Sequence, residues 1–305
     1  MNVDLRVSLG PLTLKNPVLT ASGTFGYGTE YHELFDVSRL GAVIVKTITL
    51  KPRPGNPAPR IWEVGGGMLN SIGLANVGVN VFIAEKLPEL REIGATVIVN
   101  IAGSTVEEYW ELVEKLDEHS GFSAYEINIS CPNVKDEGMA FGTSCPATEQ
   151  IVRGIRDRTK RAVIPKLTPN VTSVGEIARA CEAAGADALS LINTLVGMAV
   201  DVHTRRPRIA TVTGGYSGPP IKPVALAKLY EVRRAVSLPL IGIGGIAAAE
   251  DALEFIITGA TAVEVGTMNY VQPKTAFDII SGLTDYCIKN RIERIQDLVG
   301  TLILS

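Results

Sequence analysis

Residues 96–129, TVIVNIAGSTVEEYWELVEKLDEHSGFSAYEINI, contain two short apolar strands with an amphipathic helix between them. The runs 96–101 and 124–129 are rich in valine and isoleucine, which is typical of strands that are buried on both faces. The segment 105–118 repeats its apolar residues with helical spacing, and Ser104 is the expected N-cap of this helix. The stretch therefore predicts one strand–helix–strand unit of a parallel sheet.

The same unit recurs along the rest of the chain. Apolar strands are expected at residues 17–21, 42–48, 96–101, 124–129, 163–167, 188–192, 239–243 and 261–265. The helices expected between them include 105–118, 147–161, 173–184, 223–236, 249–258 and 275–289. Eight such units without a linker or a break in composition favour an α/β fold, a closed (β/α)8 TIM barrel, and a single domain over residues 1–305.

Three segments lie outside this repeat. Residues 1–17 alternate with a period of two on both sides of Gly10-Pro11, which predicts an N-terminal β-hairpin. Two longer excursions, 50–80 and 197–218, follow the second and the sixth strand. Because both follow strands, we expect both insertions to lie over the carboxyl-terminal face of the barrel, where such folds build their sites.

An open, doubly wound sheet is the main structural alternative. The segment Gly242-Ile-Gly244-Gly245-Ile-Ala247 follows a strand and matches the glycine fingerprint of a dinucleotide site, and an acidic residue, Glu264, follows about twenty residues later. Glu264, however, lies inside its strand, whereas the acid that binds a ribose belongs at the end of one. The motif also comes in the seventh of eight units, so the barrel is favoured.

The composition excludes several classes of function. A net charge of -3 over 305 residues offers no electrostatic reason to expect a nucleic acid partner. No apolar run is long enough to span a bilayer and the N-terminus lacks the pattern of a signal peptide, so a cytoplasmic protein is expected, with no membrane contact. The four cysteines share no CxxC spacing, and no histidine lies near a cysteine pair. We therefore expect neither a disulfide framework nor a metal or iron–sulfur site in this chain.

Polar side chains stand at the carboxyl ends of several expected strands. Lys46, Asn100, Asn128, Lys166 and Asn193 each end or nearly end a run of apolar residues. A single buried residue of this kind usually pairs with loop carbonyls, but five on different strands at one end of a barrel predict a site. With Cys131, which follows Asn128 by three residues, the set holds amides, ammonium groups and a thiol, but no carboxylate pair and no histidine. Amides suit a planar ligand with imide edges, such as a pyrimidine or a flavin ring.

Two glycine clusters follow the last two strands. Gly244-Gly245 comes after the seventh strand and Gly266-Thr267 after the eighth. Barrels of this kind commonly hold a phosphate on backbone N–H groups at these two turns. Tight turns alone would also explain the glycines, but their position favours a phosphate, and with it a phosphorylated substrate or FMN.

These motifs together resemble a known family. Asn128-Ile-Ser-Cys131-Pro-Asn133, with Asn70-Ser-Ile-Gly-Leu74, Ile192-Asn193-Thr194 and the glycine clusters, is similar to the dihydroorotate dehydrogenases over essentially the whole chain. The resemblance implies an FMN-dependent enzyme of pyrimidine biosynthesis that oxidises dihydroorotate to orotate. It implies that Cys131 takes the proton from C5 of the substrate while a hydride passes from C6 to the flavin N5. A thiol, with a pKa of about 8.5, is a workable base near neutral pH.

The resemblance also implies which residues contact the ligands. The substrate would be held by Lys46, Asn70, Ser71, Ile72, Gly73, Leu74, Asn128, Asn133, Asn193 and Thr194. The flavin would contact Ser22, Lys46, Thr47, Asn100, Asn128, Lys166, Ile192 and Gly218, with Gly244, Gly245, Gly266 and Thr267 around its phosphate. A cationic Lys166 would stabilise the reduced, anionic flavin, and the polar segment 132–144 would form a lid over the substrate.

Within the family, the segments Cys131-Pro-Asn-Val-Lys135 and Asn193-Thr-Leu-Val-Gly-Met198 resemble the NAD-linked, two-subunit class. Membrane-bound members use serine as the base and carry a helical anchor, and the fumarate-using homodimers usually have serine after the asparagine of the sixth strand. The resemblance implies a partner subunit with FAD and a 2Fe-2S cluster, around a homodimer of this chain in a heterotetramer. Two alternatives remain. The chain could be a flavin enzyme that acts on other dihydropyrimidines, or a non-enzymatic barrel that binds phosphate or nucleotides.

Overall fold

Eight parallel strands close into a barrel in the computed structural model, which describes residues 3–130 and 141–304. The order of the strands around the barrel is β10-β15-β16-β3-β4-β7-β8-β9. Their bounds are β3 Val18–Thr20, β4 Ala42–Ile44, β7 Val97–Ile101, β8 Ala124–Asn128, β9 Ala162–Leu167, β10 Leu189–Leu191, β15 Leu240–Ile243 and β16 Ala262–Val265. The predicted barrel is confirmed, and the open sheet is excluded.

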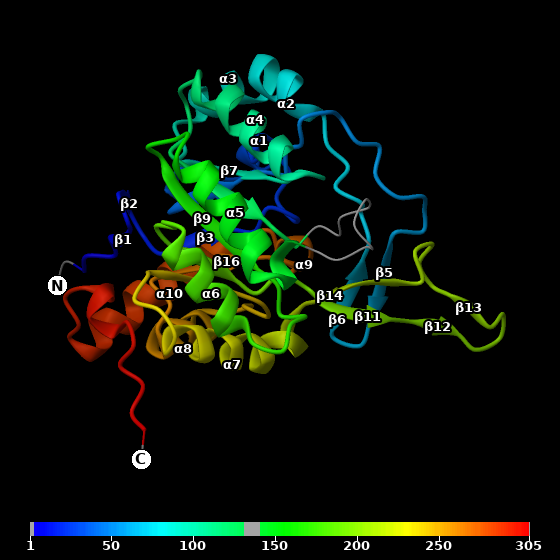
Figure 1. Ribbon diagram of the computed structural model, residues 1–305. Helices are drawn as coiled ribbons and strands as arrows, with labels where there is room; N and C mark the ends of the chain where they lie inside the picture. The colour runs from blue at the N-terminus through cyan, green and yellow to red at the C-terminus, as the bar shows by residue number, and fades with distance from the viewer. Residues whose placement is uncertain (1–2, 131–140, 305) are drawn as a thin grey trace.

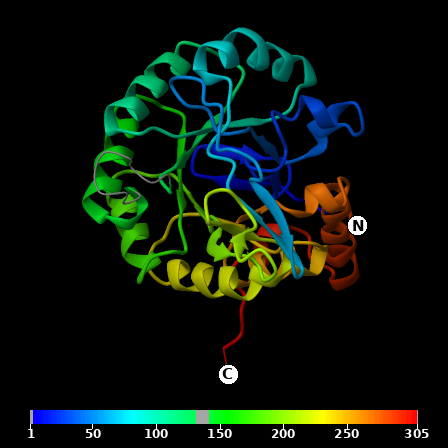
Figure 2. The same cartoon turned by 90° about the vertical axis from the view of Figure 1, so that its right-hand side faces the viewer.

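Helices form the outer layer around these strands (Figure 2). Their bounds are α1 Thr29–His32, α2 Gly78–Val81, α3 Leu87–Ile93, α4 Val106–Asp117, α5 Cys145–Arg156, α6 Val174–Ala183, α7 Lys222–Arg233, α8 Ala249–Thr258, α9 Met268–Val271 and α10 Thr275–Asn290. The six predicted helices correspond to α4 through α8 and α10. None of the helices in the described part of the chain has the length and apolar character that crossing a bilayer requires.

The start of α4 differs from the prediction by one residue. Thr105, not Ser104, is the N-cap, and its hydroxyl accepts a hydrogen bond from the backbone N–H of Glu108. The Glu108 carboxylate in turn accepts from the backbone N–H of Ser104 at 2.6 Å. Both hydroxyl residues are reasonable caps by type, and the hydrogen bond that the Glu108 N–H donates to the Thr105 hydroxyl makes Thr105 the cap.

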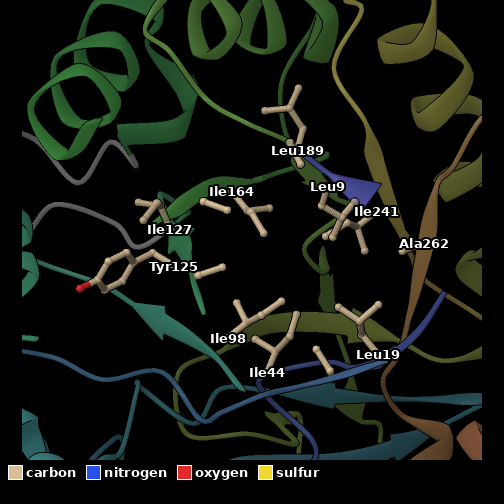
Figure 3. Packing of buried hydrophobic residues seen from close by; sticks show 14 of the residues in the cluster. Leu9, Leu19, Ile44, Ile98, Tyr125, Ile127, Ile164, Leu189, Ile241 and Ala262 are labelled. Carbon is tan, nitrogen blue, oxygen red and sulfur yellow. The ribbon is translucent and has the colours of Figure 1, made fainter. Parts of the chain in front are cut away.

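The barrel interior is apolar below the carboxyl ends of the strands. Alternate residues of the strands point inward, and side chains from strands far apart in sequence meet there (Figure 3). The buried set includes Leu9, Leu19, Ile44, Ile98, Ile164 and Ile241. Burial of each of these side chains contributes roughly 2 kcal/mol to the free energy of folding. This layer leaves only the carboxyl end of the interior for polar groups.

The N-terminal hairpin covers the other end of the barrel. Strands β1 Val7–Leu9 and β2 Leu12–Leu14 pair antiparallel, as predicted. Gly10 turns the chain between them with a φ of 59°, and a Cβ there would lie 2.8 Å from the Cβ of Asp187, just before β10. The hairpin therefore lies at the amino ends of the barrel strands and leaves the carboxyl ends open.

The two insertions meet over the carboxyl ends. The first contains β5 Ile61–Val64 and β6 Gly67–Asn70; the second contains β11 Leu195–Met198, β12 Val200–Asp201, β13 Arg206–Pro207 and β14 Thr213–Ser217. Both therefore lie where they were predicted to lie (Figure 1). Their pairing was not predicted: β14 joins β6 antiparallel, which makes one four-stranded sheet in the order β11-β14-β6-β5.

Candidate functional site

A cavity lies at the carboxyl end of the barrel, where the strand ends face the four-stranded sheet. Its walls come from the ends of the barrel strands, from the segment that follows β6 and from the glycine turns after β15 and β16. The residues predicted from the sequence that line it are Ser22, Lys46, Thr47, Asn70, Ile72, Gly73, Leu74, Asn128, Lys166, Ile192, Asn193, Thr194, Gly218, Gly244, Gly245, Gly266 and Thr267. One cavity thus brings together residues from nearly the whole length of the chain.

Two of the predicted residues lie away from the cavity wall. Asn100 is completely buried, and its amide nitrogen donates to a carboxylate oxygen of Glu126. The hydroxyl of Ser71 accepts a hydrogen bond from the Asn56 amide at 2.9 Å. The predicted base Cys131, Asn133 and most of the predicted lid lie outside the described residues.

Amide groups at the ends of β8 and β10 lie next to one another. The Asn193 amide nitrogen donates to the Asn128 side-chain oxygen at 3.4 Å, and the backbone N–H of Thr194 donates to the Asn193 side-chain oxygen at 2.8 Å. Across the cavity, the Asn70 amide nitrogen donates to the Gly215 carbonyl at 3.4 Å. The two contacts at 3.4 Å are long, so these amides can exchange them for shorter bonds to a ligand.

The glycine turns after β15 and β16 form part of the cavity wall. Gly244 and Gly245 have φ values of 125° and 74°, and a Cβ on Gly245 would lie 2.7 Å from the backbone nitrogen of Lys222, so both positions require glycine. In the part of the chain that the structure describes, the backbone N–H groups of Gly245, Gly266 and Thr267 have no hydrogen-bond acceptor. Unpaired N–H groups from two neighbouring turns suit an anion such as a phosphate.

Lys46 brings a positive charge to the cavity wall. Burial of the side chain, together with the charge of Arg60, lowers the pKa of the Lys46 ammonium. Among residues 3–130 and 141–304, no carboxylate pairs with it. An anionic ligand in the cavity would therefore favour the charged form of Lys46 and gain an ion pair.

The floor of the cavity holds a buried charge cluster of Glu126, Lys166 and Glu264. The Lys166 ammonium lies 2.8 Å from a Glu264 oxygen and 3.3 Å from each Glu126 oxygen, and both carboxylates are fully buried. The expectation that the polar set contains no carboxylate pair was wrong. Lys166 is thus a cation that is paired with two buried carboxyl groups, and the sequence analysis did not indicate these partners.

Further residues line the cavity that the sequence did not indicate. They are Ala21, Gly23, Thr24, Ile61, Met68, Ala75, Ser217, Ile221, Ile243, Ile246, Met268 and Tyr270. Several come from the four-stranded sheet, whose pairing brings them over the barrel. Ser217, for example, shares a 2.9 Å hydrogen bond with the hydroxyl of Thr267. Its only signal in the sequence was its position directly before Gly218.

Comparisons with known proteins agree with this architecture. A family model described as dihydroorotate dehydrogenase matches residues 4–286. The chain is 54% identical over 299 residues to the dihydroorotate dehydrogenase B (NAD(+)), catalytic subunit, of Geotalea daltonii, with 98% of each chain covered. It is 52% identical over 299 residues to the protein of the same name from Geobacter sulfurreducens, again over 98% of each chain.

Among solved structures, the crystal structure of DHODH in complex with ferulenol from Eimeria tenella superimposes with a TM-score of 0.80. The match covers 98% of this chain and 88% of that one at 24% identity, so it supports the fold alone. The family suggested by the motif around Asn128 is confirmed by the match over nearly the full chain. This protein belongs to the dihydroorotate dehydrogenase family.

Proposed function

We propose that this chain oxidises dihydroorotate to orotate in pyrimidine biosynthesis, as the FMN-binding catalytic subunit of an NAD-linked enzyme. The observation that carries the proposal is one cavity whose wall contains both amide side chains and the unpaired backbone N–H groups of two glycine turns. The first set suits a ring with imide edges and the second a phosphate. In the proposal, one barrel domain, residues 1–305, binds both ligands.

FMN fits the residues that are present. Bound FMN would supply the acceptor for the hydride. Its phosphate would be held by the N–H groups of Gly245, Gly266 and Thr267, where a larger side chain at Gly245 would collide with the backbone. Lys46, Asn128 and the residues at the other strand ends would hold the ring. The sequence-based assignment of Ser22, Thr47, Ile192, Gly218 and Gly244 to the same ligand is consistent with their places on the cavity wall.

The substrate would lie against the amides. Asn70, Asn128, Asn193 and Thr194 offer donors and acceptors to the edges of a dihydropyrimidine ring, and in the proposal Asn133 completes this set. The turn at Gly73 and Leu74, with φ values of 72° and 54°, lines the same cavity. Left-handed turns of this kind can present successive backbone N–H groups to an anion, here the substrate carboxylate.

Cys131 is the proposed base because of its position and because the other cysteines do not suit the task. It follows Asn128, which lines the cavity, by three residues. Burial raises the pKa of the Cys181 and Cys287 thiols, so both remain protonated. Cys145 is the first residue of α5 and does not line the cavity. Held in the charged form, the Cys131 sulfur would accept the proton from C5.

The first prediction tests the function as a whole. The purified protein is expected to carry FMN, to show the absorbance of an oxidised flavin and to lose that absorbance when dihydroorotate is added without oxygen. Absorbance spectra before and after the addition are the measurement. A colourless protein that cannot be reconstituted with FMN refutes the proposal. A flavin that another dihydropyrimidine bleaches, and dihydroorotate does not, identifies a related enzyme of different substrate class.

Electrons must leave the reduced flavin, and residues 3–130 and 141–304 contain no group of side chains that could hold a metal centre to accept them. The cysteines of the chain lack the spacing of a cluster site, and the matched relatives are named catalytic subunits. We therefore propose a cytoplasmic partner subunit with FAD and a 2Fe-2S cluster, bound to a homodimer of this chain in a heterotetramer. Exposed apolar side chains of the four-stranded sheet, Ile61, Val196 and Met198, which are 46%, 66% and 53% exposed, offer surface for such contacts.

The second prediction concerns the electron acceptor. After reduction with dihydroorotate, the isolated chain is expected to pass electrons to artificial acceptors but to be reoxidised only slowly by NAD, because the one glycine motif that resembles a dinucleotide site, Gly242 to Ala247, is assigned to the FMN phosphate. Stopped-flow absorbance of the flavin measures the rate. Addition of the proposed partner subunit should restore fast reduction of NAD. Fast reoxidation by NAD alone contradicts the two-subunit assignment, and fast reoxidation by fumarate places the chain in the homodimeric class.

A further inference from the structure

The barrel strands contain very few charges, and all of them meet at one point. Among the residues of the eight strands, the only charged side chains are Glu126 in β8, Lys166 in β9 and Glu264 in β16. They form the buried charge cluster at the floor of the cavity. One ammonium group thus faces two carboxyl groups that are both fully buried. Two ionised carboxylates would leave a net negative charge in the barrel interior, which is a costly arrangement.

The two carboxyl groups differ in their hydrogen-bond partners. Glu126 accepts from Lys166 on both oxygens, from the Ser190 hydroxyl at 2.8 Å and from the Asn100 amide. Glu264 accepts from Lys166 on one oxygen only. Its second oxygen is buried and has no partner among the described residues. Several donors stabilise a carboxylate, whereas a carboxyl with one donor and an unpaired oxygen is better suited to hold a proton.

We propose that the buried charge cluster is electrically neutral near pH 7, with Glu126 ionised as the counter-ion of Lys166 and Glu264 protonated. The inference goes beyond the proposed function and uses it only where it concerns the flavin. It changes the role expected for Lys166. Because the Glu126 carboxylate balances the Lys166 ammonium, the cluster beneath the cavity has no net positive charge. A ligand in the cavity is therefore affected by the dipole of the Lys166–Glu126 ion pair.

The physical causes of the proton affinities agree with this assignment. Burial raises the pKa of Glu264 well above its ordinary value, and the charge of Glu126 adds to the effect. Burial also opposes the ionisation of Glu126, but the Lys166 charge and the hydrogen bonds outweigh it and lower its pKa. For Lys166, burial disfavours the charged form, and the charges of Glu126 and Glu264 outweigh burial and raise its pKa.

The surroundings of the cluster contribute no other charge from the described strands. The neighbouring strands supply neutral groups: Asn100 from β7, Ser190 from β10 and Ile243 from β15. Lys46, which follows β4 on the same cavity, forms no ion pair with either glutamate. The proton on Glu264 is therefore governed by the two other members of the cluster.

The third prediction follows from the proton on Glu264. Because its folded-state pKa lies above the unfolded value, Glu264 adds stability that is fully present below about pH 4.5 and is lost as the pH rises through the folded-state pKa. Glu264→Gln keeps the neutral form and removes this titration. The ratio of the folding equilibrium constants, variant over wild type, is therefore expected to rise between pH 5 and pH 7 with a slope approaching about tenfold per pH unit. Denaturant unfolding at each pH, on the protein as purified, measures it.

Glu126→Gln is the matched control, because it makes the same chemical change at an equally buried partner of Lys166. Glutamine cannot accept from all the donors that Glu126 holds, so this variant is expected to be at least about a hundredfold less stable than Glu264→Gln at pH 6, or to fail to fold. Equal losses for the two variants, or a ratio for Glu264→Gln that does not change with pH, overturn the proposal. Neither outcome depends on whether the chain binds FMN.

A second readout uses the flavin. If Glu264 is neutral, Glu264→Gln deletes no charge, and the equilibrium constant for two-electron reduction of bound FMN should stay within about twofold of the wild-type value. An ionised Glu264 would instead make reduction at least about tenfold more favourable in the variant, about 30 mV for a two-electron couple, and that result overturns the proposal. A chain that binds no FMN but shows the pH dependence refutes the proposed function and supports the neutral cluster.

Discussion

Replacement of Cys131 by alanine is expected to slow the reduction of bound flavin by dihydroorotate by about 10²–10⁴-fold, the usual contribution of a general base. The methyl group of alanine cannot take the proton from C5, so the substrate would bind without reacting at the normal rate. FMN should remain bound, because the Cys131 side chain is not among the groups proposed to hold it. Stopped-flow absorbance of the flavin, with dihydroorotate as the only reductant, measures the effect.

Two further variants make this result specific to Cys131. Cys131→Ser should retain part of the rate, with the largest share at high pH, because a hydroxyl gives up its proton less readily than a thiol. Cys145→Ala is the matched control, since Cys145 is a free, partly exposed thiol outside the cavity. It should reduce its flavin at the wild-type rate. If Cys131→Ala does so as well, the base is another group.

Substitution of Gly266 by valine is expected to weaken the binding of FMN by about 10²-fold, the value of one or two lost hydrogen bonds to a charged group. Gly266 has no left-handed φ, and the nearest atom to an added Cβ is the Ala21 Cβ at 3.7 Å, so the fold itself has room for a side chain. Both residues line the cavity, however, and the added side chain would take space that the proposal assigns to the phosphate. Fluorescence titration of the flavin-free protein with FMN measures the affinity.

Gly65→Val is the control for this variant. Gly65 also has open space around an added Cβ and no left-handed φ, but it lies in the turn between β5 and β6 and not on the cavity wall. It should bind FMN with wild-type affinity. Circular dichroism should show both variants folded. Wild-type affinity in a folded Gly266→Val protein would place the phosphate elsewhere.

Much of the barrel could be predicted because its strands are buried on both faces. The apolar runs of β7 and β8 could be recognised in the sequence: β8 ends at Asn128 on the cavity wall, and β7 carries the buried Asn100 one residue before its end at Ile101. Helix ends were harder to predict. Helix α5 begins two residues earlier than expected because Ser144 caps it, and it ends at Arg156. Local contacts of single side chains decide such ends, and a periodic pattern does not contain them.

The part of the site that escaped prediction depends on contacts between distant segments. Lys166 lies 40 positions from Glu126 and 98 from Glu264, so no local motif links the three. Glu264 was used only as an argument against a dinucleotide site, on the ground that it lies inside a strand. That position was described correctly, but a barrel interior can hold a carboxyl group there when a lysine from another strand lies within 2.8 Å. The three side chains come into contact only in the closed barrel, so the sequence alone does not reveal that they are partners.

The sheet formed by β11, β14, β6 and β5 joins two insertions whose paired residues Asn70 and Gly215 are 145 positions apart. Each insertion supplies residues to the cavity. Each also supplies a pairing partner to the other, because β6 of the first insertion pairs with β14 of the second. Neither can therefore change its length or register alone. A chimera with another member of the family therefore has to exchange both insertions as one unit to keep the cavity covered.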